Sequence, residues 1–164
     1  MRQIVLIIHN VRSAHNVGSL LRTADGLGLD KVIISGYSPY PVTQNDTRLP
    51  HLAQKTASQI AKTALGAENS VVWSRIDDLD EAINDLAARG FTIAALEQTK
   101  TAKPLNNYRP PDKIALIVGN EITGIDERLL EMANAHLMIP MLGNKESFNV
   151  AVAGAMALYH LRYS

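Results

Sequence analysis

The chain has 164 residues with 16 basic and 16 acidic side chains, so its formal net charge at pH 7 is zero. This length is sufficient for one domain with a full hydrophobic core, and the lack of cysteine excludes disulfides, thiolate metal ligands and a cysteine nucleophile. No stretch has the pattern of a signal peptide or the length of an apolar membrane span. We therefore expect a cytoplasmic protein that has no membrane partner.

The zero net charge hides an uneven distribution along the chain. Up to Leu65 the sequence contains seven lysines and arginines but only three acidic residues, whereas residues 66–134 are rich in acids. The N-terminal part can therefore present a basic face, as nucleic-acid binders often do. A solvated helix surface is the alternative interpretation of the same pattern.

The first elements predict a strand–helix–strand unit. The apolar run Arg2–His9 is rich in β-branched residues, which indicates a central strand buried on both faces. Asn16 can cap a helix that runs to about Leu27, and Gly28 suits the position after its last turn. The apolar segment Lys31–Ser35 predicts a second strand. This unit is the repeating module of a parallel α/β sheet.

The rest of the chain continues this alternation. A long polar loop, residues 36–50, precedes an alanine-rich helix. We predict helices at 51–65, 79–89 and from Asp126, further strands at 71–74, 91–96, 114–118 and 136–140, and a polar loop at 97–111. About six strands separated by helices predict a single α/β domain over residues 1–164, with a mostly parallel sheet and helices on both faces.

The C-terminal segment 137–161 combines a short strand, a glycine-bearing loop and a helix. Ser147 is placed to cap this helix, which runs to Tyr159 and is apolar nearly all round. Gly154 lies in the middle of the helix, where glycine costs about 1 kcal/mol relative to alanine, so we expect another backbone to come close. On its own, this segment also fits a buried terminal helix of an ordinary α/β domain.

Several familiar enzyme classes are disfavoured because their motifs are missing. The chain contains no G-x-x-x-x-G-K-[ST] phosphate loop, no G-x-G-x-x-G after the first strand and no G-x-S-x-G nucleophile elbow. The five histidines lack the spacing of a zinc-hydrolase site, so we expect no metal.

Polar residues instead follow three of the predicted strands, at the position where open α/β sheets bind ligands. They are Asn16 and Arg22 after the first strand, Gly119, Asn120 and Glu121 after 114–118, and Ser147 and Asn149 after the last. Each residue alone is also explained as a helix cap, a turn or a surface salt-bridge partner. Their joint occurrence after three different strands favours a ligand site.

Three sequence blocks resemble the motifs of the SpoU/TrmH-type branch of the SPOUT RNA methyltransferases. The blocks are NVRSAHNVGSLLRTADGLGLDKVIISG from Asn10, LIVGNEITGI from Leu116 and IPMLGNKESFNVAVAGAMALYHL from Ile139. The segment KTALGAE, from Lys62 to Glu68, is also similar to one that these proteins often carry. The blocks follow the order and spacing of the family, and the resemblance covers essentially the whole chain.

The resemblance implies a fold with a deep C-terminal trefoil knot, with knot and cofactor region at approximately 91–164. It implies that S-adenosyl-L-methionine is the cofactor and that a homodimer builds each active site from both subunits. The implied reaction is methyl transfer to a ribose 2'-hydroxyl of structured RNA, with tRNA favoured over rRNA. The chain resembles a minimal form without an N-terminal RNA-binding extension. A non-catalytic RNA-binding protein on the same fold is the alternative.

The resemblance also assigns roles to individual residues. The positions that match the family's catalytic and polar motif residues are Arg22, Asn16, Glu121, Ser147 and Asn149. The positions that match the cofactor pocket are Leu96, Gly119, Ile139, Met141 and Phe148.

The resemblance places Arg22 at the attacking hydroxyl. A guanidinium stays protonated and has no acceptor lone pair, so it is a poor general base. Our hypothesis is that Arg22 binds the adjacent phosphate and lowers the pKa of the hydroxyl electrostatically. Further candidates for RNA contact are Arg12, His15 and Arg48 at phosphates and Tyr37 or Tyr40 as stacking platforms, although a plain surface role is the favoured interpretation of these five.

Overall fold

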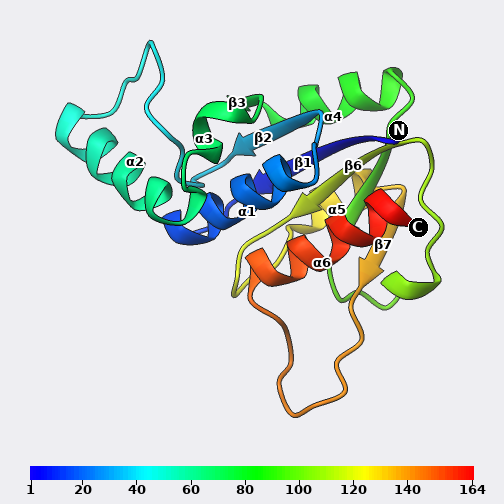
Figure 1. Cartoon of the computed structure of the whole chain (residues 1–164). Helices are drawn as coiled ribbons and strands as arrows, with labels where there is room; N and C mark the ends of the chain where they lie inside the picture. The colour runs from blue at the N-terminus through cyan, green and yellow to red at the C-terminus, as the bar shows by residue number, and fades with distance from the viewer.

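A computed structural model describes residues 1–164 as one seven-stranded sheet flanked by helices (Figure 1). All strand pairs are parallel, in the order β3-β2-β1-β6-β4-β7-β5. The strands are β1 (Gln3–His9), β2 (Lys31–Ser35), β3 (Trp73–Arg75), β4 (Thr92–Leu96), β5 (Lys103–Pro104), β6 (Lys113–Val118) and β7 (Ala135–Met138). The helices are α1 (Ala14–Gly26), α2 (Pro50–Ala64), α3 (Ala67–Ser70), α4 (Leu79–Ala88), α5 (Glu127–Met132) and α6 (Val150–Tyr163), with a short 3-10 turn at Leu105–Asn107.

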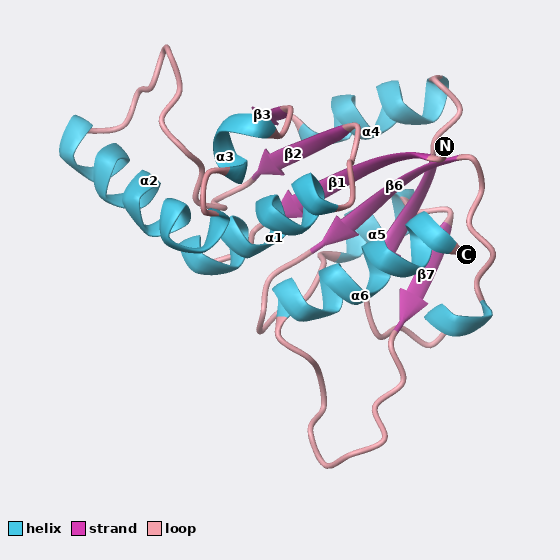
Figure 2. Ribbon diagram, in the orientation of Figure 1, coloured by secondary structure: helices cyan, strands magenta, loops and turns pink.

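The sheet separates two hydrophobic layers, with helices on both faces (Figure 2). In β1, Ile4, Leu6 and Ile8 join the layer formed with α1, α2, α3 and α6. Val5 and Ile7 join the opposite layer, formed with α4 and α5. Because β1 is covered on both faces, its sequence is a continuous apolar run and not an alternating one. The predicted α/β fold class is therefore confirmed.

The sheet contains one strand more than the sequence predicts. β5 has only two residues, Lys103–Pro104, and lies inside the segment that we predicted as a polar loop. It pairs with β7 at the edge of the sheet, where a proline costs no ladder hydrogen bond on its outer side. A strand this short has no hydrophobic period, so its position depends on the pairing partner alone.

Helix α1 begins earlier than predicted. Its N-cap is Ser13, whose side chain accepts a hydrogen bond from the Asn16 N–H at 3.3 Å. Asn16 therefore lies in the first turn, and its side-chain amide is available for contacts outside the helix. Gly28 follows the last turn with a φ of +60°, which confirms its predicted place after the helix.

The prediction that Ser147 caps the last helix was wrong. The N-cap of α6 is Asn149, whose Oδ1 accepts from the N–H groups of Ala151 at 2.9 Å and Val152 at 3.4 Å. Asparagine and serine are about equally good N-caps, so composition did not distinguish the two positions. Residues 139–149 form an irregular loop that projects below the sheet in Figure 1.

Gly154 faces the interior of its own chain. A Cβ at this position would lie 2.7 Å from Leu20 Cδ2 in α1, so the close neighbour is a side chain and not the expected backbone. The larger residues Val152, Met156 and Tyr159 are 48%, 42% and 61% exposed. α6 thus packs its small face against α1 and leaves a large apolar face uncovered. The trefoil knot that the resemblance implies stays a prediction.

Candidate functional site

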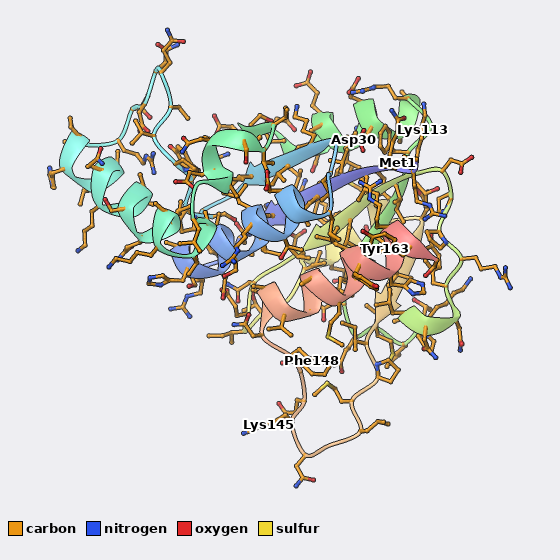
Figure 3. All side chains as sticks on the ribbon, viewed as in Figure 1. Met1, Asp30, Lys113, Lys145, Phe148 and Tyr163 are labelled. Carbon is orange, nitrogen blue, oxygen red and sulfur yellow. The ribbon has the colours of Figure 1, made fainter.

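A cavity of about 260 Å³ opens at the carboxyl ends of β4, β6 and β7, which are neighbours in the sheet. The irregular loop before α6 contributes to its wall, and Figure 3 shows Phe148 near the start of that helix and Lys145 further out on the same loop. Apolar lining residues include Leu96, Val118, Leu137, Ile139 and Phe148, and polar ones include Glu97, Gln98, Asn120, Glu121 and Ser147. Ligands of open α/β sheets bind at this end of the strands.

Four of the five residues predicted to bind the cofactor line this cavity, namely Leu96, Gly119, Ile139 and Phe148, whereas Met141 does not. At Gly119 a Cβ would lie 2.6 Å from Ile125 Cγ1 and 2.8 Å from the Gly124 carbonyl oxygen. Only glycine therefore allows the chain to fold back so tightly after β6. The cofactor role of these residues stays a prediction.

The loop after β6 is held by Asn120. Its Oδ1 accepts from the N–H groups of Ile122 and Thr123, both at 2.8 Å. Its Nδ2 donates to the Asn10 carbonyl at 3.1 Å and to the Tyr37 hydroxyl at 2.8 Å. Asn120 is mostly buried, with 8% exposure, so these bonds fix the segment that presents the neighbouring carboxylate.

Glu97 supports the same loop from β4, and our sequence predictions did not include it. Its Oε2 accepts from the Ile125 N–H at 2.9 Å, and a Cβ at Gly124 would lie 2.3 Å from this oxygen. The next residue, Gln98, donates from Nε2 to the Glu146 carbonyl at 2.7 Å. Glu97 directly follows the predicted strand 91–96. A polar residue at the carboxyl end of a strand is the sequence feature that could have identified it.

Glu121 lies at the centre of a polar cluster. Its Oε1 accepts from Asn16 Nδ2 at 2.8 Å and from the Ser13 N–H at 3.3 Å, and its Oε2 accepts from the Arg12 N–H at 3.0 Å. Asn149 Nδ2 donates to Asn16 Oδ1 at 3.2 Å. The cluster, defined here as Asn16, Glu121 and Asn149, therefore joins α1, the loop after β6 and the start of α6.

The environment of Glu121 favours its ionised form. Partial burial raises the pKa of the carboxyl, but hydrogen bonds from the Arg12 N–H and the Asn16 amide outweigh burial and leave the pKa below its ordinary value. The amino end of α1, where these donors lie, also favours a negative charge. At neutral pH the cluster therefore contains a carboxylate anion.

The predicted catalytic residues do not all meet. Glu121 and Ser147 line the cavity, and Asn16 and Asn149 are bonded in the cluster at its rim. Arg22 lies elsewhere, in a cleft between α1 and α2. Within one chain, the arginine that we expect at the attacking hydroxyl is thus not part of the cavity.

The predicted RNA contacts also differ in their surroundings. Arg12 and His15 are exposed, and Tyr37 is 61% exposed. Arg48 is half-buried: it donates from Nε to Asp46 Oδ1 at 2.8 Å, and its guanidinium lies 3.7 Å from the centroid of the Tyr40 ring. Hydrogen bonding by Arg48 also holds the pKa of Asp46 well below its usual range. The structure therefore gives Arg48 and Tyr40 a role in holding the loop 36–49.

No group of three or more histidine, acidic or cysteine side chains is arranged to hold a metal ion. No helix combines the length and the apolar character required to cross a bilayer.

Comparison with known proteins relates this site to a family. The model of the SpoU rRNA methylase family matches residues 3–159, which is nearly the whole chain. The chain belongs to the SpoU rRNA methylase family. It is 32% identical over 158 residues to the 23S rRNA guanosine 2'-O-methyltransferase RlmP of Bacillus subtilis. This alignment covers 96% of the chain and 57% of the relative, so the chain spans little more than half the length of the curated relatives that it matches.

Solved structures share the SpoU fold of this chain. A TrmH/SpoU tRNA modifying enzyme of A. aeolicus superposes with a TM-score of 0.81 at 23% identity, over 99% of this chain and 75% of the other. An AdoMet-bound rRNA methyltransferase of Sinorhizobium meliloti superposes with a TM-score of 0.80 at 22% identity, over 99% of this chain and 57% of the other. These likenesses confirm the fold.

Proposed function

We propose that this chain is a methyltransferase domain that transfers a methyl group from S-adenosyl-L-methionine to a ribose 2'-hydroxyl of RNA. The observation that carries the proposal is the Glu121 cluster at the rim of a cavity built from three adjacent strands. The name of the Bacillus subtilis relative, a 2'-O-methyltransferase acting on rRNA, supports the same chemistry. The AdoMet-bound structure from Sinorhizobium meliloti supports the choice of cofactor.

The cavity suits such a cofactor in size and lining. Its volume of about 260 Å³ is close to the lower end of the range for small-molecule sites. Leu96, Ile139 and Phe148 offer apolar contact for a planar base, whereas Glu97 and Ser147 offer polar groups. When bound, the sulfonium cofactor supplies a methyl group that its own positive charge has activated. The protein then mainly has to position the reactants.

The cluster provides this positioning. The Glu121 carboxylate holds Asn16, and Asn16 holds Asn149 at the start of α6, so the carboxylate fixes three segments around the rim. Arg22 would bind the phosphate next to the attacked ribose, and its charge would lower the pKa of the 2'-hydroxyl. The released proton would pass to phosphate or water.

We further propose that the active protein is a homodimer. Arg22 lies outside the cavity of its own chain, so a second copy is needed to bring an arginine to the reacting ribose. α6 offers a surface for this contact, because Val152, Met156 and Tyr159 expose a continuous apolar face beside the cavity loop.

Calorimetric titration with S-adenosyl-L-methionine tests the cofactor. We expect binding to the wild-type chain and loss of binding in Ile139→Arg, which places a charge against the cavity wall. Val42→Arg is the matched control, because Val42 lies on the exposed loop before α2 and is 48% exposed. A wild-type chain that binds no S-adenosyl-L-methionine would contradict the enzyme and favour a non-catalytic RNA-binding protein.

Mapping of 2'-O-methyl groups in cellular RNA tests the reaction. RNA from cells that lack the protein should lose methylation at a defined ribose, and the wild-type gene should restore it. Arg22→Lys should restore little, because an ammonium lacks the planar fork that binds phosphate. The family resemblance led us to favour tRNA, whereas the names of the relatives include both rRNA and tRNA enzymes, so both RNA classes have to be mapped. A methyl group found on a base would contradict the proposed chemistry.

A further inference from the structure

The segment KTALGAE, Lys62–Glu68, has no role in the site described above. It begins in the last turn of α2, and α2 packs closely on α1. A Cβ at Gly18 of α1 would lie 2.2 Å from Thr63 Oγ1 and 2.3 Å from the Ile60 carbonyl oxygen of α2. Thr63 Oγ1 donates to the His15 carbonyl at 2.8 Å, which ties the two helices together. The close crossing fixes the position of Lys62, the neighbour of Thr63, relative to α1.

A cleft of about 520 Å³ lies where the two helices cross. Its lining is entirely polar and consists of Ser19, Arg22 and Thr23 from α1 and Lys62 and Thr63 from α2. The three α1 residues share one face of the helix because they are spaced at i, i+3 and i+4. The cleft therefore combines two cations with the Ser19 hydroxyl, whereas the hydroxyls of Thr23 and Thr63 donate to the backbone carbonyls of Ser19 and His15.

The two cations of this cleft have no partner within the chain. Arg22 and Lys62 are exposed, and neither forms an ion pair or a side-chain hydrogen bond. No acidic residue lines the cleft, and α2 contains none at all. The only acid of α1, Asp25, accepts a hydrogen bond from Ser70 Oγ at 2.5 Å. The positive charge of the cleft is thus available to an anion from outside.

We propose that this cleft binds a backbone phosphate of the RNA and that Lys62 is a positioning residue that holds the phosphate beside Arg22. The proposal rests on the proposed function, since it assumes an RNA substrate. Arginine supplies paired donors and lysine a compact charge, and both combine with hydroxyls in phosphate contacts. Such contacts fix the register of a nucleic acid without reading its sequence.

Helix α1 connects this cleft to the Glu121 cluster. Asn16 of the cluster and Arg22 of the cleft are six residues apart, about 9 Å along the helix axis. The close contact at Gly18 and the hydrogen bond of Thr63 join α2, which carries Lys62, to the helix that carries Arg22 and Asn16. In the proposed homodimer, Lys62 and Arg22 of one chain would hold the phosphate for the cavity of the other chain.

RNA binding at increasing KCl concentration tests the proposal, with unfractionated bacterial tRNA and total rRNA as separate probes. Lys62→Gln should weaken binding about tenfold and reduce the slope of log K against log salt by about 0.7 to 0.9, the share of one lost phosphate contact. Lys62→Arg should keep the wild-type slope. Lys55→Gln, an exposed lysine on the same helix but outside the cleft, is the matched control and should also keep it.

Two further measurements separate this proposal from the proposed function. Inorganic phosphate should shift the NMR amide signals of Ser19, Thr23 and Thr63 in the wild type, and much less in Lys62→Gln. Calorimetry should give the same affinity for S-adenosyl-L-methionine in both proteins. If Lys62→Gln binds RNA with the wild-type slope, or phosphate shifts no signal in the cleft, the cleft proposal is wrong even where cofactor binding is intact. If neither RNA binds to the wild type, the proposed substrate class fails together with it.

Discussion

Glu121 shows how the position of one carboxylate depends on backbone donors that are distant in sequence. Its oxygens accept from the Arg12 and Ser13 N–H groups, more than 100 residues earlier in the chain. These donors lie at the amino end of α1, so the carboxylate stabilises both the fold and the cluster. The residue therefore has a structural effect that can be measured without a substrate.

Replacing Glu121 by glutamine should lower the free energy of unfolding at pH 7 by about 1 to 2 kcal/mol, because the negative charge is lost and the amide nitrogen that replaces one oxygen cannot accept a hydrogen bond. Because the pKa of Glu121 is lowered in the native state, the ionised carboxylate stabilises the fold at pH values above its ordinary pKa of 4.5. This stabilisation is lost as the pH falls through the pKa of Glu121 in the native state. Urea unfolding at pH 7 and in acid checks both effects. Equal stability of the two proteins at pH 7 would contradict this account.

His9 is a second residue whose environment predicts a pH effect. It is 8% exposed at the end of β1, and its Nδ1 lies 2.9 Å from Ser35 Oγ. Burial lowers the pKa of His9, and the opposing attraction of Asp126, 3.4 Å from Nε2, does not compensate.

The native protein therefore resists protonation of His9, whereas the unfolded chain takes up this proton near pH 6.5. We expect the free energy of unfolding to fall as pH decreases below about 6.5. His9→Gln should remove this part of the pH dependence, as measured by urea unfolding at a series of pH values. A variant with the same pH dependence as the wild type would assign the effect to other groups.

At the level of elements, glycines decide how closely helices pack. Gly18 and Gly26 both lie in α1, but their surroundings differ: a Cβ at Gly18 would clash with α2, whereas nothing lies within 4 Å of the corresponding position at Gly26. The sequence motif around Gly18 thus has a packing reason, which the local pattern did not reveal.

Gly18→Ala should destabilise the protein by about 1 to 3 kcal/mol, because the added methyl group overpacks the α1–α2 contact. Gly26→Ala is the control on the same helix, and it should be neutral or stabilising by up to about 1 kcal/mol. Thermal and urea unfolding of both variants check this prediction. Similar effects of the two substitutions would show that the close packing is not important for stability.

The uncovered face of α6 leads to a prediction about assembly. Light scattering should give the wild-type chain a mass about twice its 17.9 kDa. Val152→Glu should shift the protein toward the monomer, because it places a charge in the proposed apolar contact. Val72→Glu is the matched control, since Val72 is 65% exposed on a different part of the molecule. A wild-type monomer, or dissociation by both variants, would contradict an interface on α6.

At the level of the whole molecule, the sequence predicted more of the fold than of the site. β2 has the predicted bounds, and the other long strands agree to within one or two residues, because buried parallel strands are continuous apolar runs between polar loops. The two-residue β5 was missed and the cap of α6 was misplaced by two residues. Both depend on pairing or backbone geometry that local composition does not determine.

The candidate site was predicted as a list of residues but not as an arrangement. The motifs pointed to Asn16, Glu121 and Asn149, and the Asn16 side chain is hydrogen bonded to each of the other two. The motifs also pointed to Arg22, which lies in a different cleft of the same chain. Glu97, which holds the loop after β6, belongs to none of the three blocks, and only the folded chain brings its carboxylate to the Ile125 N–H.

The sequence by itself therefore determined the long strands and helices, because each is encoded by a local pattern of apolar residues that ends at glycines or polar loops. The tertiary structure alone decided which strand ends meet. The order β6-β4-β7 builds the cavity, and the contacts of Glu121 with Arg12 and of Asn149 with Asn16 span 109 and 133 residues. Such contacts follow from the order of strands in the sheet, and the local hydrophobic pattern of the sequence does not specify that order.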